Sequence, residues 1–193
     1  MTAEIAGAAP MAETDGKLRC PWSEGSQLYR DYHDHEWGKP LHGDDAMFER
    51  MCLEAFQSGL AWITILRKRP AFRAAFAGFA IERVAAFGDD DAARLLADPG
   101  IVRNRAKIDA AIANARVAAN LDIGLDELIW SFAPAPRPRP RTIAEVPATT
   151  PESVALAKEL KRRGFRFVGP TTAYALMQAT GMVDDHLADC WVR

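Results

Sequence analysis

The sequence predicts an all-α fold, and three observations lead to that prediction. The alternation of polar and apolar residues that marks a half-buried strand is almost absent from the 193 residues. Apolar residues recur instead at spacings of three and four, as on one face of a helix. Capping residues, glycines and prolines divide the chain into segments of helical length. We therefore expect about eight helices and no internal repeat.

The first part of the chain predicts an extension followed by a long helical segment. Residues 1–18, rich in Ala, Gly, Thr and Glu, predict a disordered extension. A single all-α domain is expected over 19–193. Helical spacing of apolar residues runs from Asp44, which suits an N-cap, to Leu66.

The middle of the chain predicts short and long helices around breaking residues. Short helices broken at Gly88 are expected over 81–97. An Ala-rich segment predicts one long helix over 101–121, and a shorter helix is expected over 125–132. The alternating prolines and arginines of 134–141 cannot form a helix or a central strand, so we expect an exposed, extended loop there.

Two helices are expected in the last third of the chain. Thr150 suits an N-cap and Pro151 suits the first helical position. This helix should end at Gly164. The next should begin at Gly169-Pro170 and end near Gly181.

The turn between these two helices is a candidate phosphate-binding element. Gly164 and Gly169 permit tight turns, and a helix N-terminus behind a glycine is a site for anions. Lys161, Arg162 and Arg166 surround this site with positive charge. The pattern is that of a helix-hairpin-helix element over about 155–180, which grips the DNA backbone without reading sequence; the alternative is an ordinary turn between helices. Three apolar residues should anchor the turn in the core: Phe165, Phe167 and Val168.

Size and composition indicate one globular domain. Hydrophobic residues make up 49% and charged residues 26% of the chain. No apolar run reaches the roughly 20 residues that a membrane helix needs, so we expect no membrane partner. Three cysteines are too few for a disulfide scaffold and suit a reducing compartment.

The charge is unevenly distributed along the chain. The net charge of −2, taken alone, argues against a nucleic-acid-binding protein. Residues 1–60, however, hold 11 acidic and 5 basic residues, whereas 61–193 hold 15 acidic and 19 basic ones. Basic clusters stand out at 67–73 and 158–166, and each is interpreted either as a solvated helix face or as a contact for phosphate.

Two cysteines and two histidines form a candidate metal-binding set. Cys20 and His33 are separated by 12 residues, and His186 and Cys190 by three, which on a helix would share one face. Two thiolates and two imidazoles make a closed tetrahedral zinc site, which is structural and would join the two ends of the domain. The spacing alone also allows four unrelated residues, or the alternative ligands His35 and His42.

Aromatic residues and one carboxylate gather in the N-terminal half. They are Trp22, Tyr29, Tyr32, Trp37, Glu54 and Trp62. Glu54 lies in an apolar segment, where a carboxylate needs a partner or a function. We interpret the set as a pocket whose walls stack on a flat, cationic ring and whose carboxylate accepts its hydrogen bonds; the alternative puts Glu54 on a solvent-facing side. Gly59 and Leu60, at the end of the helix that carries Glu54, would present an apolar wedge.

Together these segments resemble the DNA-3-methyladenine glycosylase I family of bacterial base-excision repair enzymes, in the helix-hairpin-helix DNA glycosylase superfamily. The resemblance covers about residues 19–190, in family order. Its most specific parts are YHDHEWG (32–38) and LEAFQSGLAW (53–62). The other matching segments are RCPW (19–22), GIVRNRAKI (100–108), WSF (130–132), the hairpin, and Asp185-His186 with Cys190.

The resemblance implies a fold, an activity and a cofactor. The fold is the all-α helix-hairpin-helix glycosylase fold, with a structural zinc ion at the four Cys and His residues and no organic cofactor. The enzyme would be a monomeric, monofunctional, cytoplasmic bacterial glycosylase. It would remove 3-methyladenine, and some 3-methylguanine, from alkylated double-stranded DNA after base flipping and release the free base.

The resemblance also implies roles for individual residues. Glu54 would recognise the extruded base and is the candidate catalytic residue. Tyr32 and Trp62 would stack on that base, with Trp22 and Trp37 completing the wall. The implied DNA contacts are Gly59, Leu60, Lys161, Arg166, Gly169 and Thr171.

Little general-acid help is expected, because N3-methylation makes adenine a cationic, good leaving group. The wider superfamily uses an aspartate after the hairpin, where Asp184 and Asp185 fall, but that role is absent from this family and we do not assign it. Two other functions remain open. One is a non-catalytic, zinc-stapled DNA-binding module, and the other is a zinc hydrolase that uses His33, His186 and Glu36.

Overall fold

The computed structural model describes residues 15–192, and every regular element in that range is a helix. The all-α prediction is therefore confirmed. The expected extension over 1–18 falls mainly on residues outside the described range. The elements are η1 (Pro21–Gly25), α1 (Gln27–His35), α2 (Asp44–Gln57), α3 (Trp62–Ala75), η2 (Ala77–Phe79), α4 (Ile81–Ala85), α5 (Asp89–Ala97), α6 (Arg105–Ala118), α7 (Leu125–Trp130), η3 (Ile143–Glu145), α8 (Pro151–Arg162) and α9 (Pro170–Ala179).

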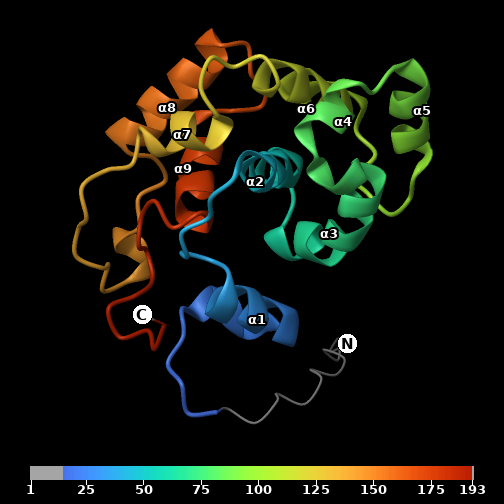
Figure 1. Cartoon of the computed structure of the whole chain (residues 1–193). Helices are drawn as coiled ribbons and strands as arrows, with labels where there is room; N and C mark the ends of the chain where they lie inside the picture. The colour runs from blue at the N-terminus through green and yellow to red at the C-terminus, as the bar shows by residue number, and fades with distance from the viewer. Residues whose placement is uncertain (1–14, 193) are drawn as a thin grey trace, which may run out of the picture.

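Helix α2 forms the centre of the fold, with α7, α8 and α9 on one side and α3 to α6 on the other (Figure 1). It packs against α3, α6, α7 and α9. Nine of its fourteen residues are buried, as expected of a helix that is surrounded by others. Two of these nine, Arg50 and Glu54, carry charge into the interior.

The helical spacing from Asp44 to Leu66 spans two helices, and the first ends just before Gly59, close to the expected end. Helix α2 ends at Gln57 and α3 begins at Trp62, because Gly59 adopts a positive φ of 82° between them. The N-cap of α2 is Gly43, so the expectation for Asp44 was wrong. The Asp44 carboxylate instead accepts a hydrogen bond of 2.9 Å from the backbone N–H of Asp126.

The long helix expected over 101–121 is shorter than predicted. Helix α6 begins at Arg105 because Asn104 caps it, its side chain accepting a hydrogen bond from the backbone N–H of Lys107. The helices expected over 81–97 are separate, and Gly88 caps the second of them.

The two helices of the hairpin occur as predicted. Thr150 and Ser153 form a capping box at the start of α8, and Gly164 ends the helix with a φ of 101°. Phe165 and Val168 are buried. Phe167 was wrongly expected in the core: it has a positive φ of 56°, which turns its side chain outward, and it is 42% exposed.

The Pro/Arg loop is extended, but it is bound to the C-terminal segment. Arg137 pairs with Asp185 at 2.6 Å, and Arg139 pairs with Asp184 at 2.6 Å. The backbone carbonyl of Pro140 accepts a hydrogen bond of 2.9 Å from Ala188. Tertiary contacts of this kind fix the loop, and its composition did not predict them.

None of the helices between residues 15 and 192 has the length and apolar character needed to cross a bilayer.

The end of α9 docks tightly on the segment that follows α1. Backbone N–H groups of Gly38 and Leu41 donate to the carbonyls of Gln178 and Thr180. Gly181 has a φ of 72°, and a Cβ at this position would lie 2.5 Å from the carbonyl carbon of Lys39. Only glycine allows the two backbones to approach this closely.

We therefore expect Gly181→Ala to destabilise the protein strongly. Gly78 is the matched control, because its φ is 71° but a Cβ there would meet no atom within 4 Å. Gly78→Ala should cost about 1 kcal/mol of unfolding free energy for the left-handed conformation alone. Gly181→Ala should cost roughly 3 kcal/mol or more, since backbone must also move. Urea denaturation of both variants measures the difference, and equal losses would contradict this account of the contact.

Candidate active site

A cavity of about 360 Å³ lies between α1, α2, α3 and α9. All six aromatic and acidic candidates line it, so the predicted pocket exists. The cavity is lined by Trp22, Tyr29, Tyr32, Trp37, Glu54, Gln57, Trp62, Ile143, Val146, Ala175, Gln178 and Asp185.

The aromatic side chains of the cavity meet one another at steep angles. The ring of Tyr32 lies 5.5 Å from that of Trp62 at an interplanar angle of 45°. The ring of Trp22 lies 5.0 Å from that of Trp37 at 75°. Neither pair is stacked face to face; edge-to-face and tilted contacts are favourable arrangements for aromatic rings. The buried indole N–H of Trp62 has no hydrogen-bond partner among residues 15–192.

Glu54 is buried in the wall of the cavity and is 6% exposed. The alternative that placed it on a solvent-facing side of the helix is therefore wrong. No residue in the described range donates a hydrogen bond to its carboxylate. Burial without such a donor raises the pKa of Glu54 to about 7, and the positive charge of Arg50 offsets this only in part.

Arg50 is occupied by other partners, one turn before Glu54 on α2. Its guanidinium donates to the hydroxyl of Tyr32 at 3.0 Å and lies 3.5 Å from the carboxylate of Glu36. Glu36 also accepts a hydrogen bond of 2.7 Å from Arg69. Burial alone would raise the pKa of Glu36, but the hydrogen bond and charge of Arg69 hold it below its usual value. This network fixes the Tyr32 ring.

Asp185 forms another part of the wall and is 2% exposed. Its carboxylate accepts hydrogen bonds from the hydroxyl of Tyr174, from the Gln178 amide at 2.8 Å and from Arg137 at 2.6 Å. Sequence reasoning missed Gln178, Ala175, Ile143 and Val146 as wall residues. Their sequence context is that of ordinary helix and loop residues, and only the packing of α9 and η3 brings them to the cavity.

The four Cys and His candidates come together beside this cavity. Cys20, His33, His186 and Cys190 are all buried, and their ligand atoms lie within 4.8 Å of one another. Cys190 Sγ is 3.5 Å from His33 Nε2 and 3.6 Å from His186 Nδ1. The cluster therefore has the donor set of a metal site. His186 and Cys190 follow α9 in a turn, so the expectation that they share a helix face was wrong.

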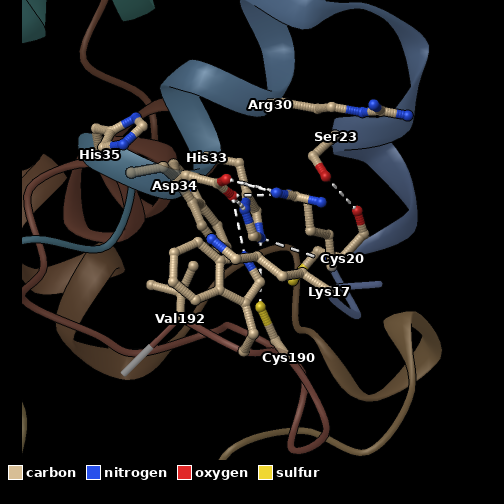
Figure 2. A network of polar contacts seen from close by, with 12 residues as sticks. Lys17, Cys20, Ser23, Arg30, His33, Asp34, His35, Cys190 and Val192 are labelled. Atoms are coloured by element: carbon tan, nitrogen blue, oxygen red, sulfur yellow. Dashed lines mark hydrogen bonds and ion pairs between the residues drawn. The ribbon is translucent and has the colours of Figure 1, made fainter. Parts of the chain in front are cut away.

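Each histidine of the cluster uses its second ring nitrogen to bind the protein. Nδ1 of His33 lies 2.8 Å from the carboxylate of Asp34, and Nε2 of His186 lies 3.1 Å from the carbonyl of Trp37. Figure 2 shows the first of these contacts. Arg19 in turn donates to Asp34 at 2.8 Å. Such partners fix which nitrogen of each imidazole points to a metal ion.

Burial sets the protonation of the cluster. It raises the pKa of the Cys20 thiol to about 12 and lowers that of His186 to about 4. The alternative ligands His35 and His42 are not in the cluster. His35 lies 3.0 Å from the carbonyl of Asp31, and His42 stacks on Trp130.

The hairpin and its neighbours carry the candidate DNA contacts. Lys161, Arg166 and Thr171 are exposed on it, and Gly169 is the N-cap of α9. The side chain of Asn114 holds the turn with two hydrogen bonds. It accepts from the backbone N–H of Arg166 and donates to the carbonyl of the same residue. Gly59 and Leu60 lie in the exposed loop between α2 and α3, where Leu60 is 38% exposed.

Much of the positive charge in the two basic clusters is bound within the protein. Arg162 and Arg163 share the carboxylate of Glu159 at 2.6 and 2.7 Å. In the other cluster, Arg69 pairs with Glu36, and Lys68 donates to backbone carbonyls. Arg69, Arg163 and Lys68 are thus engaged within the protein. Arg162, by contrast, remains 67% exposed on a solvated helix face.

Comparison with known proteins gives the same picture over the whole domain. The family model of methyladenine glycosylase matches residues 22–193. The chain is 44% identical over 180 residues to DNA-3-methyladenine glycosylase 1 of Escherichia coli, which covers 89% of this chain and 95% of that protein. It is 43% identical over 178 residues to the DNA-3-methyladenine glycosylase of Haemophilus influenzae, covering 89% and 96% of the two chains.

Solved structures agree in fold. A crystal structure of 3-methyladenine DNA glycosylase I, 44% identical, superposes with a TM-score of 0.87 over 90% of this chain and 98% of that one. The Staphylococcus aureus enzyme, 32% identical, gives a TM-score of 0.86 over 90% and 95% of the two chains. A family model spanning nearly the whole domain, with relatives above 40% identity, leaves one conclusion: the chain belongs to the methyladenine glycosylase family.

Proposed function

We propose that this protein is a monofunctional DNA glycosylase that hydrolyses the N-glycosidic bond of 3-methyladenine, and of some 3-methylguanine, in alkylated double-stranded DNA. The observation that carries the proposal is Glu54, a 6% exposed glutamate in a cavity walled by aromatic rings, whose carboxylate receives no hydrogen bond from residues 15–192. A buried anion without a partner is costly. A flat, cationic ring with an amino group supplies the missing charge and the missing donor at once.

A solved structure of a relative supports this substrate. A related structure, 32% identical with a TM-score of 0.85, is of a 3-methyladenine DNA glycosylase I in complex with 3-methyladenine. The proposed setting is the bacterial cytoplasm, where a monomer of this enzyme would act on DNA in base-excision repair. The free base would be its first product.

The cavity would work by binding the base after it leaves the duplex. The enzyme must extrude the damaged nucleotide before it can reach the glycosidic bond. Tyr32 and Trp62 would stack on the ring, and Trp22 and Trp37 would complete the wall. Stacking of π-faces on a cationic ring adds to the attraction. The Arg50 hydrogen bond holds the Tyr32 ring in place for this contact.

The chemical step needs little acid catalysis. The C1′–N9 bond breaks, its electron pair neutralises the cationic base, and the sugar becomes oxocarbenium-like. Water then adds to C1′ and releases a proton. Glu54 would accept a hydrogen bond from the 6-amino group, so that purines without this donor are bound less well. We propose Glu54 as the residue on which recognition and catalysis both depend.

The DNA would be held by the hairpin and by the loop between α2 and α3. Gly169 and Thr171 begin α9, whose free N–H groups suit a phosphate. Lys161 and Arg166 would add charge on this helix-hairpin-helix element. Leu60, carried by Gly59, would fill the gap that the extruded base leaves.

We also propose that the Cys/His cluster holds a structural zinc ion. A tetrahedral ion with Zn–S and Zn–N bonds of about 2.3 and 2.0 Å has sulfur–nitrogen edges of about 3.5 Å. The distances from Cys190 to the two histidines, 3.5 and 3.6 Å, fit this geometry. Both cysteines of the cluster are buried, and a bound cation would stabilise their thiolate forms. Four protein ligands leave no open position, which disfavours a hydrolytic zinc.

The central prediction concerns release of the base. Methylated duplex DNA incubated with the protein should lose 3-methyladenine, detected by chromatography of the released bases. Glu54→Gln should lower kcat/KM about 10- to 100-fold, the value of one hydrogen bond to a charged group. Glu127→Gln, an exposed glutamate on α7, is the control. Binding of damaged DNA without any base release would instead favour a non-catalytic sensor.

The raised pKa of Glu54 predicts a pH-dependent cost to stability. The unfolded glutamate ionises near pH 4.5 and the folded one near pH 7. The unfolded state therefore loses its proton first, and stability falls as pH rises between these values. The unfolding free energy of Glu54→Gln, relative to the wild type, should increase by about 3 kcal/mol from pH 4 to pH 8. Urea titrations across this range measure it, and a constant difference would contradict the burial of an ionised Glu54.

The zinc proposal predicts one metal ion per chain. Elemental analysis of the purified protein should find zinc, and Cys190→Ser should lose it and unfold at lower temperature. Cys52→Ser is the matched control, because Cys52 is also a buried thiol but lies in the apolar core away from the cluster. It should keep the metal. Retention of zinc by Cys190→Ser would argue against these four ligands.

A further inference from the structure

Lys107 is a buried lysine that does not line the cavity. Its hydrogen bonds go to backbone carbonyls and not to a carboxylate. It lies in the first turn of α6 and is 9% exposed. Its ammonium donates to two backbone carbonyls, that of Phe56 at 2.9 Å and that of Ser58 at 2.6 Å. Burial also holds the pKa of Lys107 below its usual value.

The position of Lys107 conflicts with its own helix. The first turn of a helix carries partial positive charge, which disfavours a cation there. The conflict is compensated by α2, whose C-terminal end presents carbonyl groups with partial negative charge to the same ammonium. Lys107 is thus unfavourable in its own helix and is compensated by a contact with a segment distant in sequence. Such a residue is expected to have a function at that contact.

The contact lies at the root of the exposed loop Ser58–Ala61. All four residues of this loop are exposed, and Gly59 gives it a left-handed turn. The side chain of Gln57 donates to the carbonyl of Leu60 at 2.8 Å, which closes the loop on one side. Lys107 holds the carbonyl of Ser58 on the other side. The backbone of the loop is thus held by Gln57 and Lys107, while the side chain of Leu60 stays exposed.

We propose that Lys107 is a positioning residue that fixes the Ser58–Ala61 loop so that Leu60 enters the duplex as the damaged base leaves it. The inference rests on the proposed function. A wedge must hold its place against the DNA while the nucleotide turns, and a loop without its anchor would lose that rigidity. Lys107 touches neither the cavity nor the reacting atoms. Its loss should therefore impair extrusion of the base and leave the pocket intact.

Lys107→Met tests the inference, since methionine keeps the length of the side chain and removes its donors. Lys68→Met is the matched control: Lys68 also donates to two carbonyls, those of Pro99 at 2.9 Å and Gly100 at 3.1 Å, away from the loop. Two readouts are compared. The first is binding of free 3-methyladenine, followed by the fluorescence of the cavity tryptophans. The second is the single-turnover rate of base release from methylated duplex DNA.

Lys107→Met should bind the free base within about twofold of the wild type and release it from duplex about tenfold more slowly or worse. Lys68→Met should change neither the binding of the free base nor the rate of its release from duplex. Leu60→Ala should lose rate similarly, and the double variant Leu60→Ala/Lys107→Met should be little slower than either alone. The inference is overturned if Lys107→Met keeps the duplex rate, or if free-base binding weakens by the same factor as the rate.

A measurement without substrate separates this inference from the proposed function. Hydrogen exchange of the backbone amides of Ser58–Ala61 should be faster in Lys107→Met than in the wild type, and unchanged there in Lys68→Met. Unchanged exchange in Lys107→Met would overturn the positioning role even if the wild type releases base normally. A wild type that releases no base would instead refute the glycosylase proposal. Should Lys107→Met not fold, Lys107→Gln, which keeps N–H donors without charge, is used for the same comparison.

Discussion

A carboxylate, Glu54, is held inside the protein on a helix that other helices surround. The burial of α2 brings Glu54 and Arg50 out of water together, but it gives them different partners. Arg50 binds Tyr32 and Glu36, whereas Glu54 receives no hydrogen bond from the described residues and has its pKa raised to about 7. The burial of the Glu54 carboxylate is unfavourable in free energy, and a cationic ligand that enters the cavity would relieve it. The aromatic walls, the network behind Tyr32 and the tight docking of α9 all serve to keep that cavity in shape.

The Cys/His cluster and the cavity share parts of the chain. Trp37 contributes its ring to the cavity wall and its carbonyl to His186. Asp185, another wall residue, immediately precedes His186. The cluster joins the beginning and the end of the domain, and the backbone N–H of Trp191 also donates to the carbonyl of Leu18 at 2.9 Å. The geometry of the cluster therefore fixes the positions of Trp37 and Asp185 in the cavity wall, although the cluster itself takes no part in the proposed chemistry.

Charge in this protein is used mainly for internal order. The sequence shows two basic clusters, but Arg69, Arg162 and Arg163 find carboxylates close by. Lys68 and Lys107 instead satisfy backbone carbonyls. In the two clusters, the cations whose side chains make no ion pair or hydrogen bond with the described residues are Arg67, Lys158, Lys161 and Arg166. A small number of phosphate contacts implies a shallow dependence of binding on salt. The net charge of −2 is thus compatible with a protein that acts on DNA.

The sequence by itself determined the helical class and the two helices around the turn at 164–169. Local signals suffice for these: capping residues, glycines at turns and the period of apolar residues. The aromatic set and the four Cys and His residues were candidates among alternatives on local signals, and the family resemblance selected them. Sequence reasoning misjudged the N-cap at Asp44, the exposure of Phe167 and the shape of the segment holding His186 and Cys190. Only the tertiary structure decided that Glu54 is buried with no donor among residues 15–192, that Gln178 and Asp185 complete the wall, and that Lys107 donates to the carbonyls of Phe56 and Ser58. These properties depend on which distant atoms meet, and a pattern along the chain does not encode the distance between Lys107 and a carbonyl 51 residues earlier.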